Sequence, residues 1–212
     1  MTTQANLFGE PALDASKSQF FTPPWLARRV VEWVHPTARV IEPSAGSGNL
    51  VDALVRLGHL ASRITAVELD PRWHAFLAEK HTGTLGALLL GDFLALPFAH
   101  GFFDVVLTNP PYENNLHTQF VTKALELAPV VIGVFPISFE YTKDRDAMLW
   151  ATKGKVTRRA RLPERVDFGG TEASGMSDHV VLQIERRHAP RMPRETCAVL
   201  EETWLKREGE AA

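Results

Sequence analysis

Residues 38–58 read ARVIEPSAGSGNLVDALVRLG and contain a β-rich run, a glycine-rich turn and an apolar repeat with helical spacing. The run Ala38–Ile41 predicts a strand, and Asn49–Leu57 predicts a helix that ends at Gly58. The turn EPSAGSG between them lets the backbone pass close to a ligand, because glycine has no Cβ atom to exclude it. A strand, a tight turn and a helix in this order form the first unit of an α/β domain.

The alternation of strands and helices continues on both sides of this stretch. Further strands are expected at Ile64–Val67, Leu85–Leu90, Asp104–Thr108, Val130–Phe135, Lys155–Leu162 and His179–Ile184. Further helices are expected from Trp25 until Pro36 ends the pattern, at Arg72–Lys80, at His117–Leu127 and, more weakly, at 143–153. This order predicts a Rossmann-like α/β fold, a mostly parallel seven-stranded sheet with helices on both faces. The predicted domain covers residues 20–186, between a flexible N-terminal arm (1–19) and a C-terminal tail (187–212).

The composition is that of an ordinary globular protein. The chain has 212 residues, of which 45% are hydrophobic and 23% charged, and its net charge is −2. This length suits one α/β domain. The single cysteine, Cys197, excludes a disulfide framework and a cysteine-based zinc site, and no metal site is expected. Because no run of about 18 apolar residues occurs and the N-terminus lacks a secretory signal, we expect a soluble cytoplasmic protein.

The charged residues are distributed unevenly along the chain. Residues 1–142 carry nine basic and thirteen acidic side chains, whereas residues 143–194 carry twelve basic and seven acidic ones. A basic band of this kind indicates a surface for phosphate groups on an otherwise neutral protein. A solvated basic surface without a partner is the alternative interpretation, and the counts alone do not distinguish the two.

Polar residues follow four successive predicted strands, at the edge where ligands bind in parallel sheets. Glu42–Gly48 follows the first strand, Glu68 the second, Asp92 the third and Asn109 the fourth. Glu68 lies where a carboxylate can accept hydrogen bonds from both hydroxyls of a ribose, although an exposed acid at a strand end has the same pattern. Asp92 can accept a hydrogen bond from an adenine amino group while Phe93 packs on the ring; a helix N-cap at Asp92 is the alternative. Four clusters at one sheet edge predict one ligand site.

The glycine-rich turn does not match a phosphate-binding loop. A dinucleotide fingerprint needs a third small residue where Val51 stands, and this turn opens with an acid, Glu42, instead of a glycine. A phosphate loop with its lysine is absent from this turn as well. We therefore expect that the turn binds a part of the ligand other than a pyrophosphate group.

The sharpest chemical signal is Asn109-Pro110-Pro111-Tyr112, directly after the fourth predicted strand. Two prolines fix φ and lack an N–H group, so the backbone is rigid and its carbonyls are free. The Asn109 side-chain oxygen and the Pro110 carbonyl can then both accept hydrogen bonds from one planar NH2 group, which makes its nitrogen more nucleophilic. Tyr112 offers a flat surface on which a base can stack.

Together these residues resemble the S-adenosylmethionine-dependent amino-methyltransferases, in particular the N6-adenine DNA methyltransferases, over about residues 18–186. The turn EPSAGSG resembles the loop that binds the methionine part of the cofactor, Glu68 the ribose-binding acid and Gly91-Asp92-Phe93 the adenine-contacting turn. The Asn109–Tyr112 segment resembles the catalytic tetrapeptide, and QFFTP at 19–23 the F-x-T-P element that closes over the cofactor. The resemblance implies the class I methyltransferase fold and these cofactor-binding residues: Phe21, Thr22, Pro23, Glu42, Pro43, Ala45, Gly46, Gly48, Glu68, Leu69, Asp92, Phe93 and Asn109.

The resemblance implies methyl transfer from S-adenosylmethionine to the N6 amino group of adenine in DNA. The target adenine is then flipped out of the duplex, held by Asn109 and Pro110, and stacked on Tyr112. Phe168 is the candidate for packing on the other face of the base. Catalysis rests on positioning and electrostatics, and no general base is needed, because the methylated nitrogen is cationic and loses its proton readily.

Few residues remain for reading a DNA sequence. Only 26 residues follow Arg186, whereas sequence-specific members of the resembled family carry a sizeable recognition domain. DNA contacts are therefore expected from the loops around 137–178, the basic stretch Lys143–Arg165 and the tail. This predicts short or relaxed sequence specificity, as in orphan enzymes without a restriction partner.

Other planar amino groups remain as alternative acceptors: adenine N6 in RNA, a protein glutamine, and cytosine N4 in DNA. Thr22-Pro23 and the basic stretch favour DNA, and the glutamine enzymes usually carry a helical domain ahead of the glycine-rich loop. Cytosine-N4 enzymes more often have serine at the position of Asn109. Cytosine-C5 methylation is excluded because Pro111 stands where the catalytic cysteine is required. A module that binds cofactor or DNA without transfer is the alternative from another class.

The N-terminal arm contains a separate motif. Gln4-Ala5-Asn6-Leu7-Phe8 resembles the Q-x-x-L-F pentapeptide with which bacterial replication proteins dock on the sliding clamp. A flexible arm with a Leu-Phe anchor suits a peptide ligand, so a sliding clamp is a candidate partner. The alternative is that Leu7 and Phe8 pack on the fold or have no partner.

Overall fold

A computed structural model of the chain describes residues 9–11, 20–162, 166–168 and 178–186, together with the backbone of 201–204. The strands are β1 (Val40–Glu42), β2 (Ile64–Glu68), β3 (Ala87–Leu90), β4 (Val105–Thr108), β5 (Val130–Pro136), β6 (Gly154–Arg161), β7 (His179–Arg186) and β8 (Glu201–Trp204). The α-helices are α1 (Pro24–Val31), α2 (Asn49–Arg56), α3 (Pro71–His81), α4 (Leu116–Leu127) and α5 (Lys143–Thr152). Short 3-10 helices lie at η1 (Ala61–Arg63), η2 (Glu113–Asn115) and η3 (Ile137–Tyr141).

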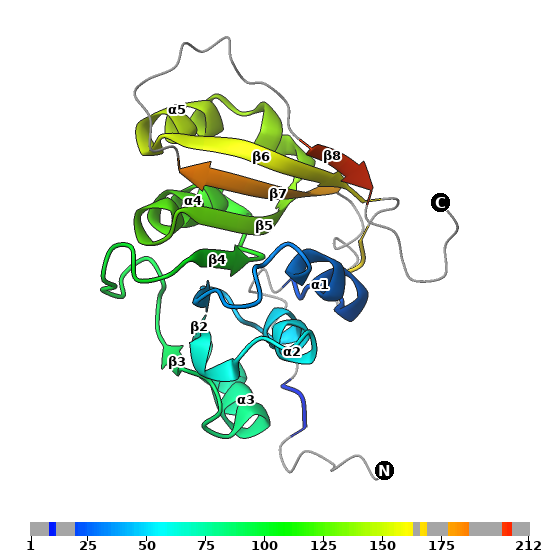
Figure 1. Cartoon of the computed structure of the whole chain (residues 1–212), viewed down its shortest axis with the longest axis vertical. Helices are drawn as coiled ribbons and strands as arrows, with labels where there is room; N and C mark the ends of the chain where they lie inside the picture. The colour runs from blue at the N-terminus through cyan, green and yellow to red at the C-terminus, as the bar shows by residue number, and fades with distance from the viewer. Residues whose placement is uncertain (1–8, 12–19, 163–165, 169–177, 187–200, 205–212) are drawn as a thin grey trace.

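The described strands form one sheet in the order β3-β2-β1-β4-β5-β7-β6-β8 (Figure 1). The first five of these run parallel to one another, whereas β7 runs antiparallel to both β5 and β6. The strand order reverses between β1 and β4, since β2 and β3 lie on one side of β1 and all later strands lie on the other. In such sheets, ligands bind at the carboxyl ends of the strands beside this reversal.

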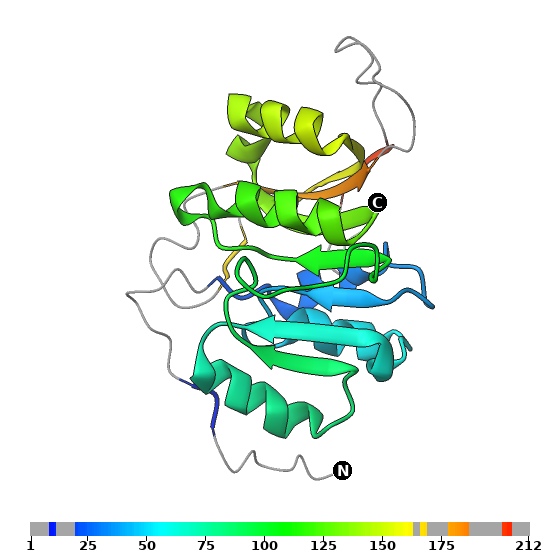
Figure 2. The same cartoon turned by 90° about the vertical axis from the view of Figure 1, so that its left-hand side faces the viewer.

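Helices cover both faces of the sheet (Figures 1 and 2). On one face α1 and α2 pack through fully buried side chains such as Leu26 and Leu54. On the other face α4 and α5 pack through Val121 and Met148. Each helix contributes an apolar stripe to one of the two cores. The predicted layered α/β architecture is therefore confirmed.

Local chemistry explains where the helices begin. Pro24 is the first residue of α1, where its missing N–H group has no helical partner to lose. The Asp70 side chain accepts a hydrogen bond from the Arg72 N–H (3.0 Å) at the start of α3. The Thr142 side chain accepts one from the Arg145 N–H (3.2 Å) at the start of α5. These N-caps satisfy backbone donors that the helices themselves leave open.

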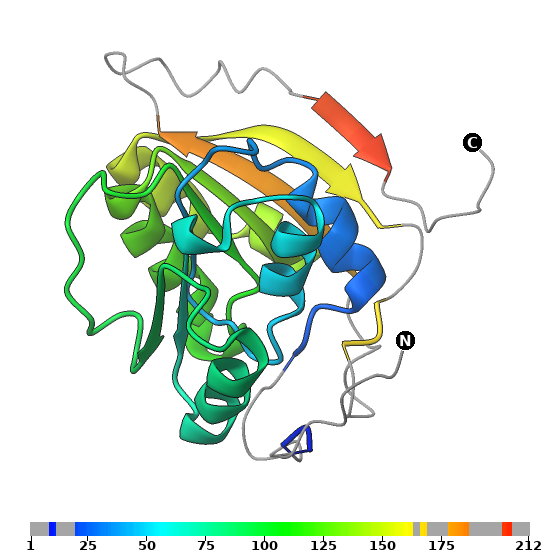
Figure 3. The same ribbon diagram turned by 60° about the horizontal axis from the view of Figure 1, so that its bottom comes forward.

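All seven predicted strands are present, with shifted ends. β1 begins at Val40 and includes Glu42, so this carboxylate lies on the strand itself and not in the turn. The predicted sheet has seven strands, and residues 201–204 of the tail add an eighth, β8, parallel to β6 (Figure 3). Its sequence, EETW, lacks strand alternation, and the open edge of β6 supplies the pairing. No helix in the described part of the chain has the length and apolar character needed to cross a bilayer.

Candidate active site

The glycine-rich loop after β1 turns sharply through two glycines with positive φ. Gly46 has a φ of 53° and Gly48 a φ of 82°, a conformation that other residues rarely adopt. The Ala45 N–H donates to the Val67 carbonyl at 3.0 Å, which holds the loop against the end of β2. The loop therefore follows the carboxyl edge of the sheet before it enters α2.

Glu68 holds the glycine-rich loop from the end of β2. Its Oε2 accepts a hydrogen bond from the Gly46 N–H (2.7 Å), and its Oε1 accepts one from the Asp70 N–H (2.8 Å). The side chain is buried, and this burial raises the pKa of its carboxyl group. Each carboxylate oxygen keeps a second lone pair, so binding of ribose hydroxyls at Glu68 stays a prediction. Leu69, the next predicted cofactor contact, is exposed at the same edge.

Glu42 is buried beneath the loop. Its Oε1 accepts hydrogen bonds from the Ser44 N–H (3.2 Å) and hydroxyl (3.3 Å). Its Oε2 is buried and has no hydrogen-bond partner among the residues that the structure describes. Burial raises the pKa of Glu42 to about 8. A buried carboxyl group with an unpartnered oxygen suits a ligand that carries an ammonium or hydroxyl group, which fits the methionine end of the predicted cofactor.

Ser44 joins the glycine-rich loop to the loop that follows β4. Besides Glu42, its hydroxyl lies within hydrogen-bond distance of the main-chain carbonyl of Asn109 (3.1 Å) and of the Thr108 hydroxyl (3.1 Å). Asn109 and Pro110 are buried, whereas Pro111 and Tyr112 are half-buried. The structure thus brings the tetrapeptide and the glycine-rich turn together, with buried Pro43 between β1 and Ser44.

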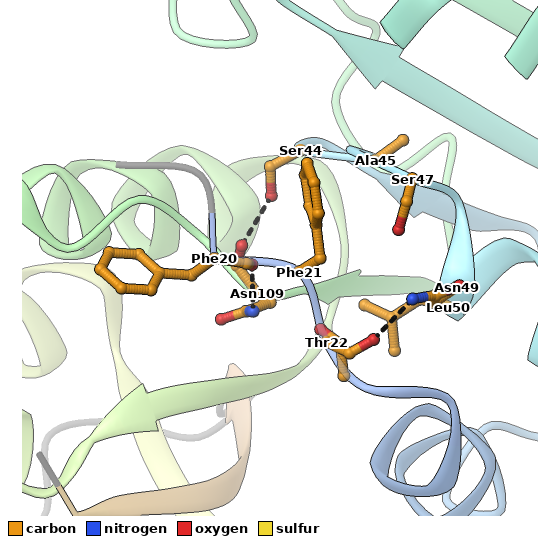
Figure 4. Close-up of a pocket in the computed structure, with 9 residues that line it drawn as sticks. All are labelled: Phe20, Phe21, Thr22, Ser44, Ala45, Ser47, Asn49, Leu50 and Asn109. Atoms are coloured by element: carbon orange, nitrogen blue, oxygen red, sulfur yellow. Dashed lines mark hydrogen bonds between the residues drawn. The ribbon is translucent and has the colours of Figure 1, made fainter. Parts of the chain in front are cut away.

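Residues 20–22, here called the strap, run past both loops and are fastened through their backbone. The Asn109 Nδ2 donates to the Phe20 carbonyl at 2.9 Å, and the Asn49 Nδ2 donates to the Thr22 carbonyl at 2.9 Å. The Phe21 N–H donates to the carbonyl of Phe168 at 3.0 Å. The strap lines a pocket together with residues of both loops (Figure 4): Ser44, Ala45, Ser47, Asn49, Leu50 and Asn109.

The Phe21 ring packs directly on the glycine-rich loop. A Cβ atom at position 46 would lie 2.7 Å from this ring, so the position needs glycine for its contact as well as for its φ. The ring also packs edge-on against buried Trp73, with 4.6 Å between centroids. Thr22 is buried in the pocket wall, whereas Pro23 is the N-cap of α1 and does not line the pocket.

Tyr112 engages the side chain of Asn109 through its hydroxyl group. This hydroxyl donates to the Asn109 Oδ1 and lies 3.3 Å from the Val134 carbonyl. Burial raises the pKa of the Tyr112 hydroxyl, so the group stays a protonated donor at physiological pH. The Asn109 amide is therefore held on both sides, at Oδ1 by Tyr112 and at Nδ2 by the Phe20 carbonyl.

Four rings, here called the aromatic cluster, pack on one another next to this amide: Phe20, Tyr112, Phe168 and His179. Phe20 stacks on Tyr112 with 5.6 Å between centroids and 26° between planes. Phe168 meets Phe20 edge-on at 6.2 Å and His179 at 4.6 Å, and His179 lies 5.4 Å from Tyr112. Phe168, the predicted base-packing residue, thus joins the same cluster as Tyr112.

The third predicted cluster consists of Asp92 and Phe93, which follow β3. Asp92 is exposed, and its Oδ1 accepts a hydrogen bond from the Leu94 N–H (2.8 Å) in a local turn of the kind that the N-cap alternative anticipated. Phe93 is buried in the hydrophobic core, with its ring 5.1 Å from Phe120 and 5.9 Å from Phe98. Phe93 therefore contributes to the hydrophobic core, and its contact with an adenine ring stays a prediction.

Part of the basic stretch is paired with acidic side chains. Arg159 lies 2.7 Å from Glu140, and Arg145 lies 2.8 Å from Asp146. The guanidinium group of Arg158 stacks over the Trp33 ring, 4.2 Å from its centroid. Net charge along the sequence therefore overstates the charge that this stretch offers to phosphate groups. Arg165 and the Gln4–Phe8 motif lie outside the described residues.

Sequence reasoning missed several residues of this site. Ser44 and Asn49 stand inside and just after the glycine-rich turn, and their polar side chains were the available signal. Phe20 was quoted only as part of the F-x-T-P element. His179 reaches the site because β7 is antiparallel, which places its first residue at the carboxyl edge of β5. No sequence pattern near position 179 predicts the antiparallel pairing of β7 with β5.

Comparison with known proteins agrees with this geometry. The family described as "Methyltransferase domain" matches residues 41–119, which include the glycine-rich loop, Glu68 and the tetrapeptide. The dimethyladenosine transferase of Candida glabrata is 33% identical over 96 residues, 42% of this chain and 29% of that protein. The matched part therefore spans less than a third of the length of this curated relative.

Solved structures share the fold at low sequence identity. A Listeria monocytogenes protein described as a class I S-adenosylmethionine-dependent methyltransferase has a TM-score of 0.66 at 16% identity, covering 92% of this chain and 68% of that one. The 23S rRNA methyltransferase ErmE has a TM-score of 0.60 at 20% identity, covering 82% and 72%. A modification subunit of a type I restriction enzyme from Vibrio vulnificus has 0.59 at 17%, covering 81% and 45%. The chain thus has the class I methyltransferase fold, and S-adenosylmethionine is the cofactor of this fold.

Proposed function

We propose that this protein transfers a methyl group from S-adenosylmethionine to the N6 amino group of an adenine in nucleic acid, with DNA as the preferred acceptor. The observation that carries the proposal is the position of Asn109. Its amide is buried at the carboxyl end of β4, beside the glycine-rich loop, and is hydrogen-bonded to Tyr112 of the aromatic cluster and to the Phe20 carbonyl. This arrangement combines a grip for a planar amine with flat surfaces for the ring that bears it.

Each residue of the tetrapeptide has a role in this reaction. The Asn109 Oδ1 and the Pro110 carbonyl accept hydrogen bonds from the amino group of the acceptor, which increases electron density on its nitrogen. The Phe20 carbonyl accepts a hydrogen bond from the Asn109 Nδ2 and so fixes which end of the amide presents oxygen. Pro111 keeps the backbone rigid, and Tyr112 supplies the stacking surface.

S-adenosylmethionine supplies an electrophilic methyl group on a sulfonium centre. The acceptor nitrogen forms a bond to the methyl carbon while the carbon–sulfur bond breaks, and the nitrogen then releases one proton to solvent. The chain contributes position and orientation, which account for large rate accelerations without acid–base catalysis. Glu42, Ala45, Gly46 and Gly48 would hold the methionine end of the cofactor, and Glu68 its ribose.

Two observations bear on the choice of acceptor. The strap carries the F-x-T-P element, whose resemblance is to DNA adenine methyltransferases, and its contacts to Asn109 and Asn49 support that reading. RNA is the second candidate, because the matched curated relatives are dimethyladenosine transferases and ErmE acts on 23S rRNA by its name. Both acceptors present the same N6 amino group to the site.

Transfer of a tritiated methyl group to unmethylated DNA, to RNA and to protein extract tests the proposal. We expect label in DNA that digestion assigns to N6-methyladenine. Asn109→Ala should lower kcat by about 100-fold or more, in the range seen when one polarising group is removed from an active site. Asn114→Gly is the matched control, since Asn114 is exposed and its φ of 49° suits glycine.

The other outcomes redirect or end the proposal. Label only in RNA would move the acceptor to RNA, and label only in glutamine or in cytosine N4 would replace adenine. Binding of S-adenosylmethionine with no label in any of the three would leave a binding module in place of an enzyme.

A further inference from the structure

The ring of Phe20 lies where a flat acceptor would have to enter the site. It stacks on Tyr112, the predicted stacking surface, and meets Phe168 edge-on. Its own carbonyl accepts the hydrogen bond from the Asn109 Nδ2, so the ring stands beside the amide that grips the acceptor. A base cannot stack on this face of Tyr112 while Phe20 occupies it.

The hydrogen bonds that hold the strap do not involve this ring. They run through the Phe20 carbonyl, the Phe21 N–H and the Thr22 carbonyl, and the Phe21 ring packs separately on Gly46 and Trp73. The side chain of Phe20 can therefore change rotamer while the backbone of the strap stays fastened. Rotamer changes of this kind need no rearrangement of the fold.

The surroundings identify Phe20 as the member of the cluster that can leave. Phe168 and His179 are buried, at 1% and 7% exposed, and belong to the packed interior. Phe20 and Tyr112 are only half-buried. If the Phe20 ring moves out, Tyr112, Phe168 and His179 remain as three walls around a space the size of one aromatic ring.

We propose that Phe20 is a resident occupant of the acceptor pocket, which a planar heteroaromatic ring must displace to reach Asn109. This inference rests on the proposed function for the identity of the acceptor, but the pocket and its occupant are features of the aromatic cluster. An acceptor embedded in a polynucleotide gains contacts along its backbone, which offset the loss of the Phe20–Tyr112 stack. A free base lacks those contacts, so the occupant discriminates against free adenine and nucleosides.

Equilibrium dialysis with radiolabelled adenine measures this competition directly. Saturating S-adenosylhomocysteine is added to block the adenine site of the cofactor. Phe20→Ala should bind adenine about three- to tenfold more tightly than the wild type, because an aromatic pair of this geometry no longer has to be broken. Phe20→Trp should bind it more weakly than the wild type, since a larger ring fills the same space.

Phe102→Ala is the matched control, because it also removes a half-exposed phenyl ring, packed against Phe103 and away from the strap and the aromatic cluster. Its affinity for adenine should equal that of the wild type. Circular dichroism and thermal melting verify that each variant is folded, and Phe20→Leu replaces Phe20→Ala if the latter does not fold.

Equal or weaker adenine binding by folded Phe20→Ala and Phe20→Leu would overturn the proposal and leave Phe20 as a fixed wall of the site. This result is independent of the transfer assay. Tighter adenine binding by the Phe20 variants, without methyl transfer to any acceptor by the wild type, would support the pocket but refute the proposed function. Methyl transfer to DNA with unchanged adenine binding by these variants would support the proposed function but refute the pocket.

Discussion

Replacing Glu42 by glutamine tests the electrostatics of the glycine-rich loop. Burial raises the pKa of this carboxyl group from 4.5 to about 8, so at neutral pH the folded protein holds a proton that the unfolded chain releases. Below pH 4.5 the group is protonated in both states and stability is unaffected. Between this value and about 8 the folded state binds more protons than the unfolded state, so the free energy of unfolding falls as pH rises.

The size of this decline follows from the pKa difference. Each unit corresponds to about 1.4 kcal/mol, so the full window is worth roughly 4 to 5 kcal/mol at most. Above about pH 8 both states are ionised and the loss is complete. Glutamine keeps the shape and the hydrogen-bonding pattern of the protonated carboxyl group, including an acceptor for Ser44, and does not titrate.

Urea denaturation of both proteins at pH 5, 6, 7 and 8 measures the effect. Wild type should lose stability relative to Glu42→Gln steadily across this range. Other titrating groups are present in both proteins, so they largely cancel in the difference. Two parallel stability curves, with a difference that changes by less than about 1 kcal/mol over the range, would refute the assignment of a buried, protonated Glu42.

Three further outcomes are expected. Gly48→Ala should lower the free energy of unfolding by about 1–2 kcal/mol more than Gly58→Ala does, in thermal or urea unfolding. Both glycines have a positive φ, but only at position 48 does the new Cβ meet a side chain, that of Leu77 at 2.5 Å. Asp70→Ala should cost about 1 kcal/mol through loss of the α3 N-cap, and a loss below about 0.3 kcal/mol would contradict this role. Tyr112→Phe keeps the stacking ring but loses the hydrogen bond to Asn109. Single-turnover methyl transfer should therefore slow about tenfold, while cofactor binding stays unchanged. An unchanged rate would show that the hydroxyl does not orient the Asn109 amide.

Local sequence patterns were sufficient for the elements and for the chemistry that follows each strand. The predicted runs coincide with β1 to β7 to within a few residues, since alternation, helical spacing and glycine turns act over short stretches. The positions of Glu68 and Asn109 at the sheet edge were predictable as well. A residue at the carboxyl end of a parallel strand lies at this common edge, because neighbouring parallel strands end on the same side of the sheet.

Local sequence patterns did not predict which neighbours a side chain contacts. Phe93 follows a strand as a ligand-binding aromatic would, yet its ring belongs to the core beneath the sheet. The arginines at 145 and 159 count as free charge in the sequence, yet each has an acidic neighbour in the fold. For Phe93 and for Arg159 the deciding partner is set by packing between elements, which a local pattern does not encode, whereas the partner of Arg145 is its neighbour in the chain.

A mostly parallel α/β sheet, the positions of its turns and a tetrapeptide suited to a planar amine could all be predicted from sequence, because they depend on neighbours along the chain. The surroundings of Asn109 could not, because they come from distant parts of the chain. The strap reaches Asn109 across 89 residues, and His179 arrives through the antiparallel pairing of β5 and β7. Such contacts depend on how distant segments pack together, and packing is a property of the whole chain.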